Sequence, residues 1–137
     1  MTGLAEHIHA IQAAKARYCA AADQCTHDPE GARAALEAVF TPDVVGDYGF
    51  DPMNGADAIA GFLSSAIAAN SEWMLHMIHS PLVEVRGAEA TGDWTVMVHS
   101  KRRETGAVDV IIGRYSDEFR LTDAGWRIVR IRFSRLT

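Results

Sequence analysis

The spacing of apolar residues changes near residue 72, and this change constrains the fold more than any other feature. Before it, apolar residues such as Leu4, Ile8 and Ile11 recur every three or four positions, which is typical of helices. From Glu72 onward apolar and polar residues alternate, which is typical of strands with one buried face. Helices followed by long antiparallel strands predict an α+β fold with the helices on one face of a curved sheet.

Turn-forming residues divide the chain into elements. Pro29 and Gly31 are expected to separate the first two helices, and glycines at 87, 106 and 125 to separate the long strands. We predict helices over 4–25, 32–40 and 56–69, and strands over 44–50, 72–85, 90–101, 108–121 and 126–135. With 137 residues and no linker or repeat, we expect a single domain over 1–137.

Charge and composition exclude several classes of protein. A formal charge of −5 argues against a nucleic-acid partner, and the basic cluster 101–103 reads as a solvated hairpin end. No apolar run is long enough to span a membrane, and the first residues do not resemble a signal peptide. Cys19 and Cys25 are the only cysteines and predict no disulfide framework. We therefore expect a cytoplasmic protein without a membrane or nucleic-acid partner.

Three of the six histidines lie in predicted strands. His7, His9 and His27 are expected to be exposed. His76 shares a strand face with Met74 and Ile78, where an unpartnered imidazole would be costly. It is therefore either a core histidine with a hydrogen-bond partner or a catalytic histidine.

The spacing of the strand histidines argues against a metal site. His76 and His79 are an odd number of residues apart, so their rings point to opposite faces of the strand. By the same alternation His99 faces outward.

Asp23 is unusual because a carboxylate in the last turn of a helix meets the negative end of the helix dipole. It either makes a local turn or orients a histidine. Tyr18 precedes it by five residues, about 140° around an ideal helix, so the two would converge only if the helix ended or distorted between them. Tyr48 and Tyr115 are either core residues or pocket residues with hydroxyls free to bind a substrate.

Strand alternation also predicts the two faces of the sheet. One face would line a pocket for a largely apolar, cyclic substrate, formed by Trp94, Val96, Val98, Ile111, Gly113 and Tyr115. The other face is apolar enough to predict a homodimer or homotrimer, through Leu75, Met77, Met97 and Val129. Glycine-rich phosphate-binding and serine-hydrolase motifs are absent, so we expect no cofactor and no metal.

Several short segments, in this order and spacing, resemble the SnoaL-like branch of the nuclear transport factor 2-like superfamily. The resemblance covers nearly the whole chain and rests on residues 16–23, 39–44, 76–85, 113–119 and 123–128. It implies a cone-shaped α+β barrel. Within the superfamily the chain is most similar to three cofactor-free lyases: scytalone dehydratase, bile-acid 7α-dehydratase and hexachlorocyclohexane dehydrochlorinase.

The resemblance also implies roles for individual residues. His76, eight residues before Glu84, matches the family's catalytic histidine, and Asp23 matches its aspartate partner. Tyr18 matches a tyrosine of the bile-acid enzyme that stands five residues before the aspartate, and Tyr48 resembles a tyrosine of scytalone dehydratase that hydrogen-bonds to substrate. The pattern departs on the last strand, where Ile131, flanked by Arg130 and Arg132, replaces an arginine of some members. A second active-site histidine of scytalone dehydratase falls at Ser100.

These residues suggest that His76 is a general base oriented by Asp23, with Tyr18 and Tyr48 donating hydrogen bonds to the substrate. A histidine has an ordinary pKa near ~6.5, which suits proton abstraction at neutral pH. The expected activity is that of a dehydratase or isomerase acting on a steroid, terpenoid or polyketide. The alternatives are a polyketide cyclase and a non-catalytic module that binds a hydrophobic ligand or dimerises.

Overall fold

The computed structural model describes residues 2–137 and has the predicted α+β architecture. Three helices and six strands follow one another as α1 (Leu4–Gln24), α2 (Pro29–Val39), β1 (Phe40–Asp47), β2 (Met53–Asn54), α3 (Ala56–Asn70), β3 (Ser71–Arg86), β4 (Glu89–Arg102), β5 (Val108–Thr122) and β6 (Gly125–Arg135). The predicted limits of α1, α3 and the four long strands differ from the observed ones by at most one residue.

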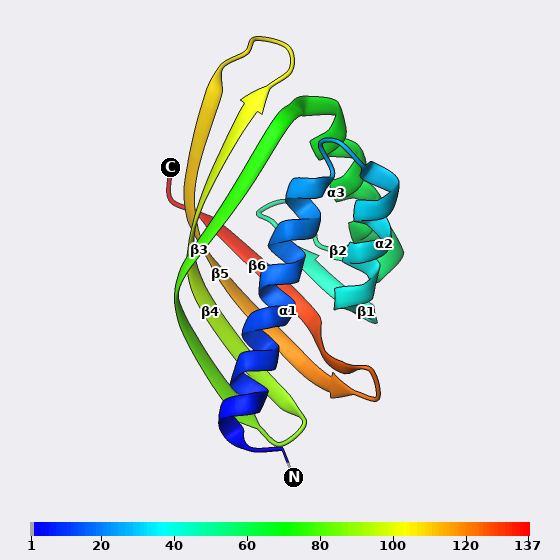
Figure 1. The fold of residues 1–137 in the computed structure, drawn as a ribbon, viewed down its shortest axis with the longest axis vertical. Helices are drawn as coiled ribbons and strands as arrows, with labels where there is room; N and C mark the ends of the chain where they lie inside the picture. The colour runs from blue at the N-terminus through cyan, green and yellow to red at the C-terminus, as the bar shows by residue number, and fades with distance from the viewer. Residues whose placement is uncertain (1) are drawn as a thin grey trace.

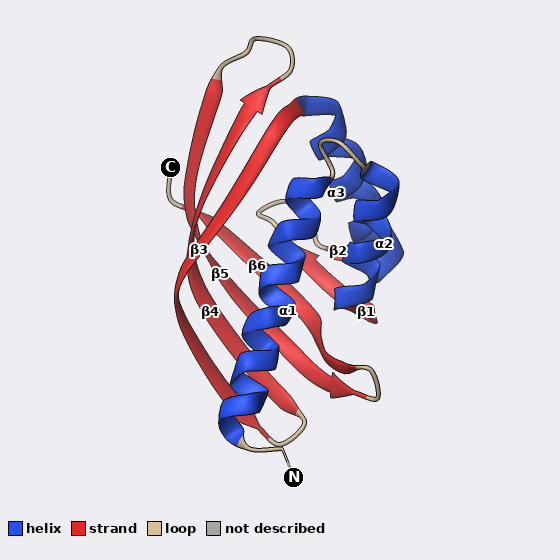
Figure 2. Cartoon of the chain, in the orientation of Figure 1, coloured by secondary structure: helices blue, strands red, loops and turns tan. Residues whose placement is uncertain are grey.

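The strands form one curved sheet in the order β2-β1-β6-β5-β4-β3. Neighbours are antiparallel except β1 and β6, which are parallel. The sheet bends around the helices without closing, so the wall of the expected cone is an open sheet (Figure 1). All three helices lie on its concave face, with α1 against β3 and α2 packed against both other helices (Figure 2).

The second helix begins at Pro29, three residues earlier than predicted. Proline interrupts a helix in its interior, but it is tolerated in the first helical turn, where its missing N–H would have no partner. Asp28 caps this helix, because its carboxylate accepts the backbone N–H of Gly31 at 3.1 Å. The prediction that residues 29–31 interrupt the helices was therefore wrong by one helical turn.

The first strand also begins earlier than the predicted residue 44. Phe40 follows α2 directly and pairs with Ile128 of β6, so the strand is set by a partner far along the chain. The two-residue strand β2 was not predicted; it forms because Val45 pairs with Asn54 across the loop. Short strands carry too few residues for an alternation pattern to reveal them.

The core lies between the concave face of the sheet and the helices. Trp94, Val96 and Val98 of β4 point inward, as alternation predicts, and are buried. The largest fully buried side chains come from every layer and include Ile11, Tyr18, Leu36, Phe40, Ile59, Phe119 and Ile128. Burying an aliphatic or aromatic side chain of this size contributes about 1.5–3 kcal/mol, so these contacts hold the helices on the sheet.

Each side chain of the basic cluster 101–103 has a partner. Arg103 donates to the backbone carbonyl of Thr26 at 2.7 Å and to that of Ala68 at 2.9 Å. It therefore joins the β4–β5 hairpin to the ends of α1 and α3. Arg102 pairs with Asp109 at 2.6 Å, and Lys101 with Glu72 at 3.3 Å.

Two of the three histidines outside the strands are exposed, as predicted, but His7 is not. His9 and His27 are exposed. His7 is half-buried, and its Nδ1 accepts a hydrogen bond from Trp126 Nε1 at 3.0 Å. The prediction was wrong because the partner comes from the other end of the chain. Among residues 2–137, no helix is both long and apolar enough to cross a membrane.

Candidate active site

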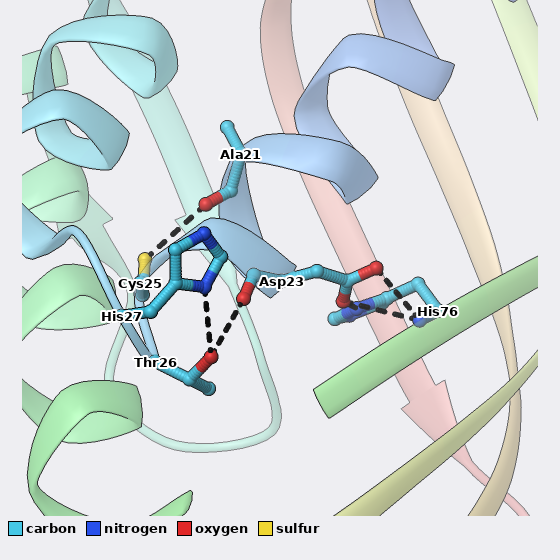
Figure 3. Close-up of polar contacts among 6 residues, drawn as sticks. All are labelled: Ala21, Asp23, Cys25, Thr26, His27 and His76. Carbon is cyan, nitrogen blue, oxygen red and sulfur yellow. Dashed lines mark hydrogen bonds and ion pairs between the residues drawn. The ribbon is translucent and has the colours of Figure 1, made fainter. Parts of the chain in front are cut away.

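Asp23 and His76 form a hydrogen-bonded pair. Asp23 is the penultimate residue of α1, and His76 lies near the start of β3. The ring Nδ1 of His76 is 2.6 Å from Asp23 Oδ1. The backbone N–H of His76 also lies 3.1 Å from each carboxylate oxygen. Figure 3 shows the carboxylate held against both the ring and the backbone of His76.

This geometry fixes the tautomer of the imidazole. An ionised carboxylate can only accept, so Nδ1 must carry the proton in the pair. In the neutral ring, Nε2 then keeps a free lone pair and can accept a proton. The side chains of His76 and Asp23 are only 8% and 20% exposed, which limits competition from water. His76 therefore has the arrangement of a general base supported by a carboxylate.

The same contacts explain why a carboxylate is tolerated at the negative end of α1. Donors on His76 compensate for the unfavourable helix dipole at Asp23. The spacing predicts that Tyr18 and Asp23 converge only if the helix ends or distorts between them, but α1 is continuous from Leu4 to Gln24. Instead, His76 bridges them: its ring contacts Asp23 and lines the same cavity as Tyr18.

His76 lines a cavity of about 150 Å³ that lies between the helices and the sheet and is open to solvent. Its wall is almost entirely apolar. The polar groups on it come from His76 and from three tyrosines, whereas the remaining lining residues are Ala22, Leu63, Ile67, Met74, Val98, Ile111 and Phe133. A cavity of this size and lining accommodates a single ring, as apolar protein cavities of about 150 Å³ bind benzene.

Two tyrosines meet at this cavity. The hydroxyls of Tyr18 and Tyr48 are 2.8 Å apart and hydrogen-bonded. In such a pair one hydroxyl donates to the other, so the acceptor keeps its own proton for another partner. Burial raises the pKa of both phenols above their ordinary value, so both remain protonated donors at neutral pH.

The structure brings most of the predicted pocket residues together. Tyr48, Val98, Ile111 and Tyr115 border the cavity with His76 and Tyr18. Trp94, Val96 and Gly113 share their sheet face, but they lie elsewhere in the core and do not line it. Trp94 packs edge-to-face on Phe119 at 6.0 Å. Alternation predicts the face of a residue correctly but not its position along the axis of the cone.

Other lining residues were not predicted as pocket residues. Leu63 and Ile67 reach the cavity from α3, and Phe133 from β6. Their helical spacing or alternation marks them as inward-facing, which was visible in the sequence. The way α3 crosses the sheet places them at the cavity, and this packing cannot be predicted from the local sequence.

The other residues named with the family resemblance lie away from the cavity. Glu84 is exposed and pairs with Arg86 at 3.2 Å. Arg132 is exposed, and Ser100 is buried without bordering the cavity. His99 lies in the outward row of β4, between Leu75 and Val110 in register. Among residues 2–137, no three or more His, Cys, Asp or Glu residues gather as metal ligands.

Among the described residues, four other hollows are larger, at about 250, 370, 440 and 320 Å³. A hollow of about 250 Å³ lies over β4 and β5 and includes Glu84, Glu118 and Arg120. Another of about 370 Å³ lies between α1, α2 and the β5–β6 turn and is lined mainly by alanines. None of the four is lined by a histidine, whereas the smaller cavity holds His76 with its carboxylate partner, so the cavity at His76 is the candidate active site.

The fold is an open α+β cone, and a histidine held by an aspartate lines its cavity. The family model of the SnoaL-like domain matches residues 4–132, which is nearly all of the chain. The chain therefore belongs to the SnoaL-like domain family, within the nuclear transport factor 2-like fold.

Solved structures share this fold over almost the whole chain. One is from Novosphingobium aromaticivorans and is provisionally assigned as an aromatic ring hydroxylase; it is 26% identical, with a TM-score of 0.87 over 99% of this chain and 93% of its own. A second from that species is provisionally assigned as a scytalone dehydratase, at 20% identity and a TM-score of 0.81 over 95% and 84%. LinA is 16% identical, with a TM-score of 0.82 over 95% and 86%. No curated protein matches the sequence.

Proposed function

We propose that the protein is a cofactor-independent lyase or isomerase that removes a proton from a carbon next to a carbonyl group. The observation that carries the proposal is the 2.6 Å contact between His76 Nδ1 and Asp23, made by a histidine that lines an apolar cavity. A core histidine would be satisfied by a backbone carbonyl, whereas a carboxylate partner also stabilises the imidazolium formed when the ring accepts a proton.

The proposed reaction begins with proton transfer from the substrate carbon to His76 Nε2. The electron pair of the C–H bond moves toward the carbonyl and forms an enolate. Hydrogen bonds from the Tyr18–Tyr48 pair to the carbonyl oxygen stabilise this negative charge as it develops. The enolate then expels a hydroxyl from the next carbon, which takes the proton from His76 and leaves as water. In an isomerisation the proton returns to a different carbon.

The cavity suggests the kind of substrate. A volume of about 150 Å³ fits one carbocyclic ring, and a lining of aliphatic and aromatic side chains favours an apolar one. A single oxygen near the tyrosines suffices to orient it. A cyclic ketone with a hydroxyl on the β-carbon, or a cyclic enone for the isomerisation, meets these requirements, and the dehydratase assignment of one fold neighbour agrees with such chemistry.

Exchange of substrate protons with solvent tests the proposal without the natural substrate. Cyclic β-hydroxyketones and enones are incubated with the protein in D₂O, and deuterium uptake next to the carbonyl is followed by NMR. Because general base catalysis contributes about 10²–10⁴-fold, His76→Gln should lower the enzymatic exchange rate at least about 100-fold. His79→Gln, three residues away on the exposed face of the same strand, should keep the wild-type rate.

The alternatives give different results in this assay. A non-catalytic module that binds hydrophobic ligands would show no exchange above the buffer rate with any ketone that it binds. A polyketide cyclase would exchange protons and, when a polyketone chain is supplied in place of the cyclic ketone, would join two of its carbons. Equal exchange rates for wild type and His76→Gln would contradict the proposal.

A further inference from the structure

A buried ion pair lies in the core beside the candidate active site. Lys15 of α1 and Asp117 of β5 are fully buried, with Nζ 2.7 Å from the carboxylate. Asp117 also accepts the backbone N–H of Arg132 at 3.3 Å. Burial raises the pKa of the Asp117 carboxyl, and the charge of Lys15 opposes this shift. Neither residue borders the cavity, and the proposed acid–base steps do not use them.

Stability alone explains such a pair poorly. Removing two charges from water is expensive, and replacing a buried ion pair with apolar residues of similar volume is often neutral or stabilising. The position of Lys15 in the apolar stripe of α1 would suit a leucine or methionine. The role of Lys15 therefore depends on the groups that its ammonium contacts.

The Lys15 ammonium rests on the rings of two tyrosines. Nζ is 3.3 Å from the ring centroid of Tyr115 and 4.4 Å from that of Tyr18. The two rings meet edge-to-face, at 5.9 Å and 82°. The face of an aromatic ring carries partial negative charge, so it attracts the ammonium and is held by it. Both rings line the cavity, and the Tyr18 hydroxyl is bonded to that of Tyr48.

We propose that Lys15 is a positioning residue that makes the tyrosine wall of the cavity selective for an oxyanion. Held by Asp117, its ammonium fixes the Tyr18 ring and stabilises negative charge on an oxygen that accepts a hydrogen bond from the Tyr18–Tyr48 pair. This inference rests on the proposed function, because it concerns the enolate oxygen of that reaction. The carboxylate of Asp117, 2.7 Å from Nζ, holds the ammonium over the rings.

The low polarity of the site makes the effect large enough to measure. A charge acts more strongly across buried aromatic rings than across water, because little solvent screens it. The interaction should distinguish an anionic ligand from a neutral ligand of the same shape. A residue that only filled space would affect both ligands equally.

Two single-ring probes separate these cases. 4-Nitrophenolate carries a negatively charged phenolate oxygen. Nitrobenzene has nearly the same shape but no phenolate oxygen and no net charge. Dissociation constants for both are measured by isothermal titration calorimetry at a pH where the phenol is ionised. In Lys15→Met/Asp117→Asn, where the asparagine still accepts the Arg132 N–H, affinity for 4-nitrophenolate should fall about tenfold. Affinity for nitrobenzene should stay within a factor of two.

Each other outcome contradicts a stated part of the account. If the double variant binds both probes as the wild type does, or loses affinity for both equally, the role of Lys15 is refuted and the proposed function stands. If wild type binds neither probe, the cavity does not take an oxygenated ring, and the proposed function fails together with the inference. Should this variant not fold, Lys15→Met/Asp117→Leu, an apolar replacement, gives the same comparison.

Discussion

At the scale of single residues, burial decides which side chains can exchange protons. His76 is held by a carboxylate and borders a cavity, whereas the thiol of Cys19 is enclosed in the core. Burial raises the pKa of Cys19 from 9.0 to about 12, an effect that Lys15 partly opposes. The thiol of the folded protein is therefore an unreactive, protonated group at neutral pH.

This shift predicts how stability changes at alkaline pH. Above about pH 9 the unfolded thiol ionises while the folded one keeps its proton, so the contribution of Cys19 to stability is lost as pH rises toward 12. The free energy of unfolding of wild type, relative to Cys19→Ala, should fall by up to about 1.4 kcal/mol per pH unit in this range. Urea unfolding of both proteins at several pH values measures the difference. A difference independent of pH would contradict the assignment.

Individual site residues were predictable to different degrees. His76 could be placed because alternation gives its face, and the resemblance supplied Asp23 as its partner. Their contact, however, depends on where the end of α1 meets β3, which no local pattern encodes. Lys15 was visible as a charged residue in an apolar stripe, but its partner Asp117 is more than a hundred residues away. Pairings of this kind are set by tertiary packing.

At the scale of elements, the start of α2 is fixed by the side chain of Asp28. Asp28 accepts from Gly31 and also from the side chain of Gln24 at 3.0 Å. Asp28→Ala should lower the free energy of unfolding by about 1 kcal/mol, and Asp28→Asn by much less, because loss of a side-chain cap leaves a helix N–H unpaired. Urea unfolding monitored by circular dichroism checks this.

A control in the same turn distinguishes capping from loss of surface charge. Glu30 is exposed in the first turn of α2, and Glu30→Ala should change stability by less than about 0.5 kcal/mol. Equal losses for Asp28→Ala and Glu30→Ala would contradict the capping role.

Long elements were predictable from sequence, whereas short ones were not. The four long strands repeat their alternation over ten or more residues, so one misplaced residue does not hide the pattern. By contrast, β1 begins next to a helix and pairs in parallel with β6, and β2 is two residues long. Their hydrogen bonds come from partners that the local sequence does not specify.

At the scale of the whole molecule, the convex face of the sheet is apolar. Leu75 is 51% exposed and Val110 is 44% exposed, with His99 between them in register. Met77 and Met97 also lie there, half-buried, whereas Val129 lies toward the other end of the sheet, near Thr91 and Glu118. We propose that a second copy of the chain covers the face around Leu75, since single copies rarely expose a contiguous apolar patch of this kind.

Charges placed on this face should prevent assembly. Leu75→Glu combined with Val110→Glu should give a monomer by sedimentation, whereas wild type sediments as a larger species. Leu4→Glu is a matched control, because Leu4 is 62% exposed but lies at the start of α1, on the helical side of the sheet. A wild-type protein that sediments as a monomer would contradict the proposed interface.

The central claim is that Asp23 holds His76 with Nδ1 protonated and Nε2 free to accept a proton. Long-range proton–nitrogen NMR of ¹⁵N-histidine-labelled protein tests it most directly, because the nitrogen shifts distinguish the two neutral tautomers. We predict the Nδ1–H tautomer for His76 in wild type and its loss or mixing with the other tautomer in Asp23→Asn. A neutral His76 with its proton on Nε2 in the wild-type protein would contradict the account.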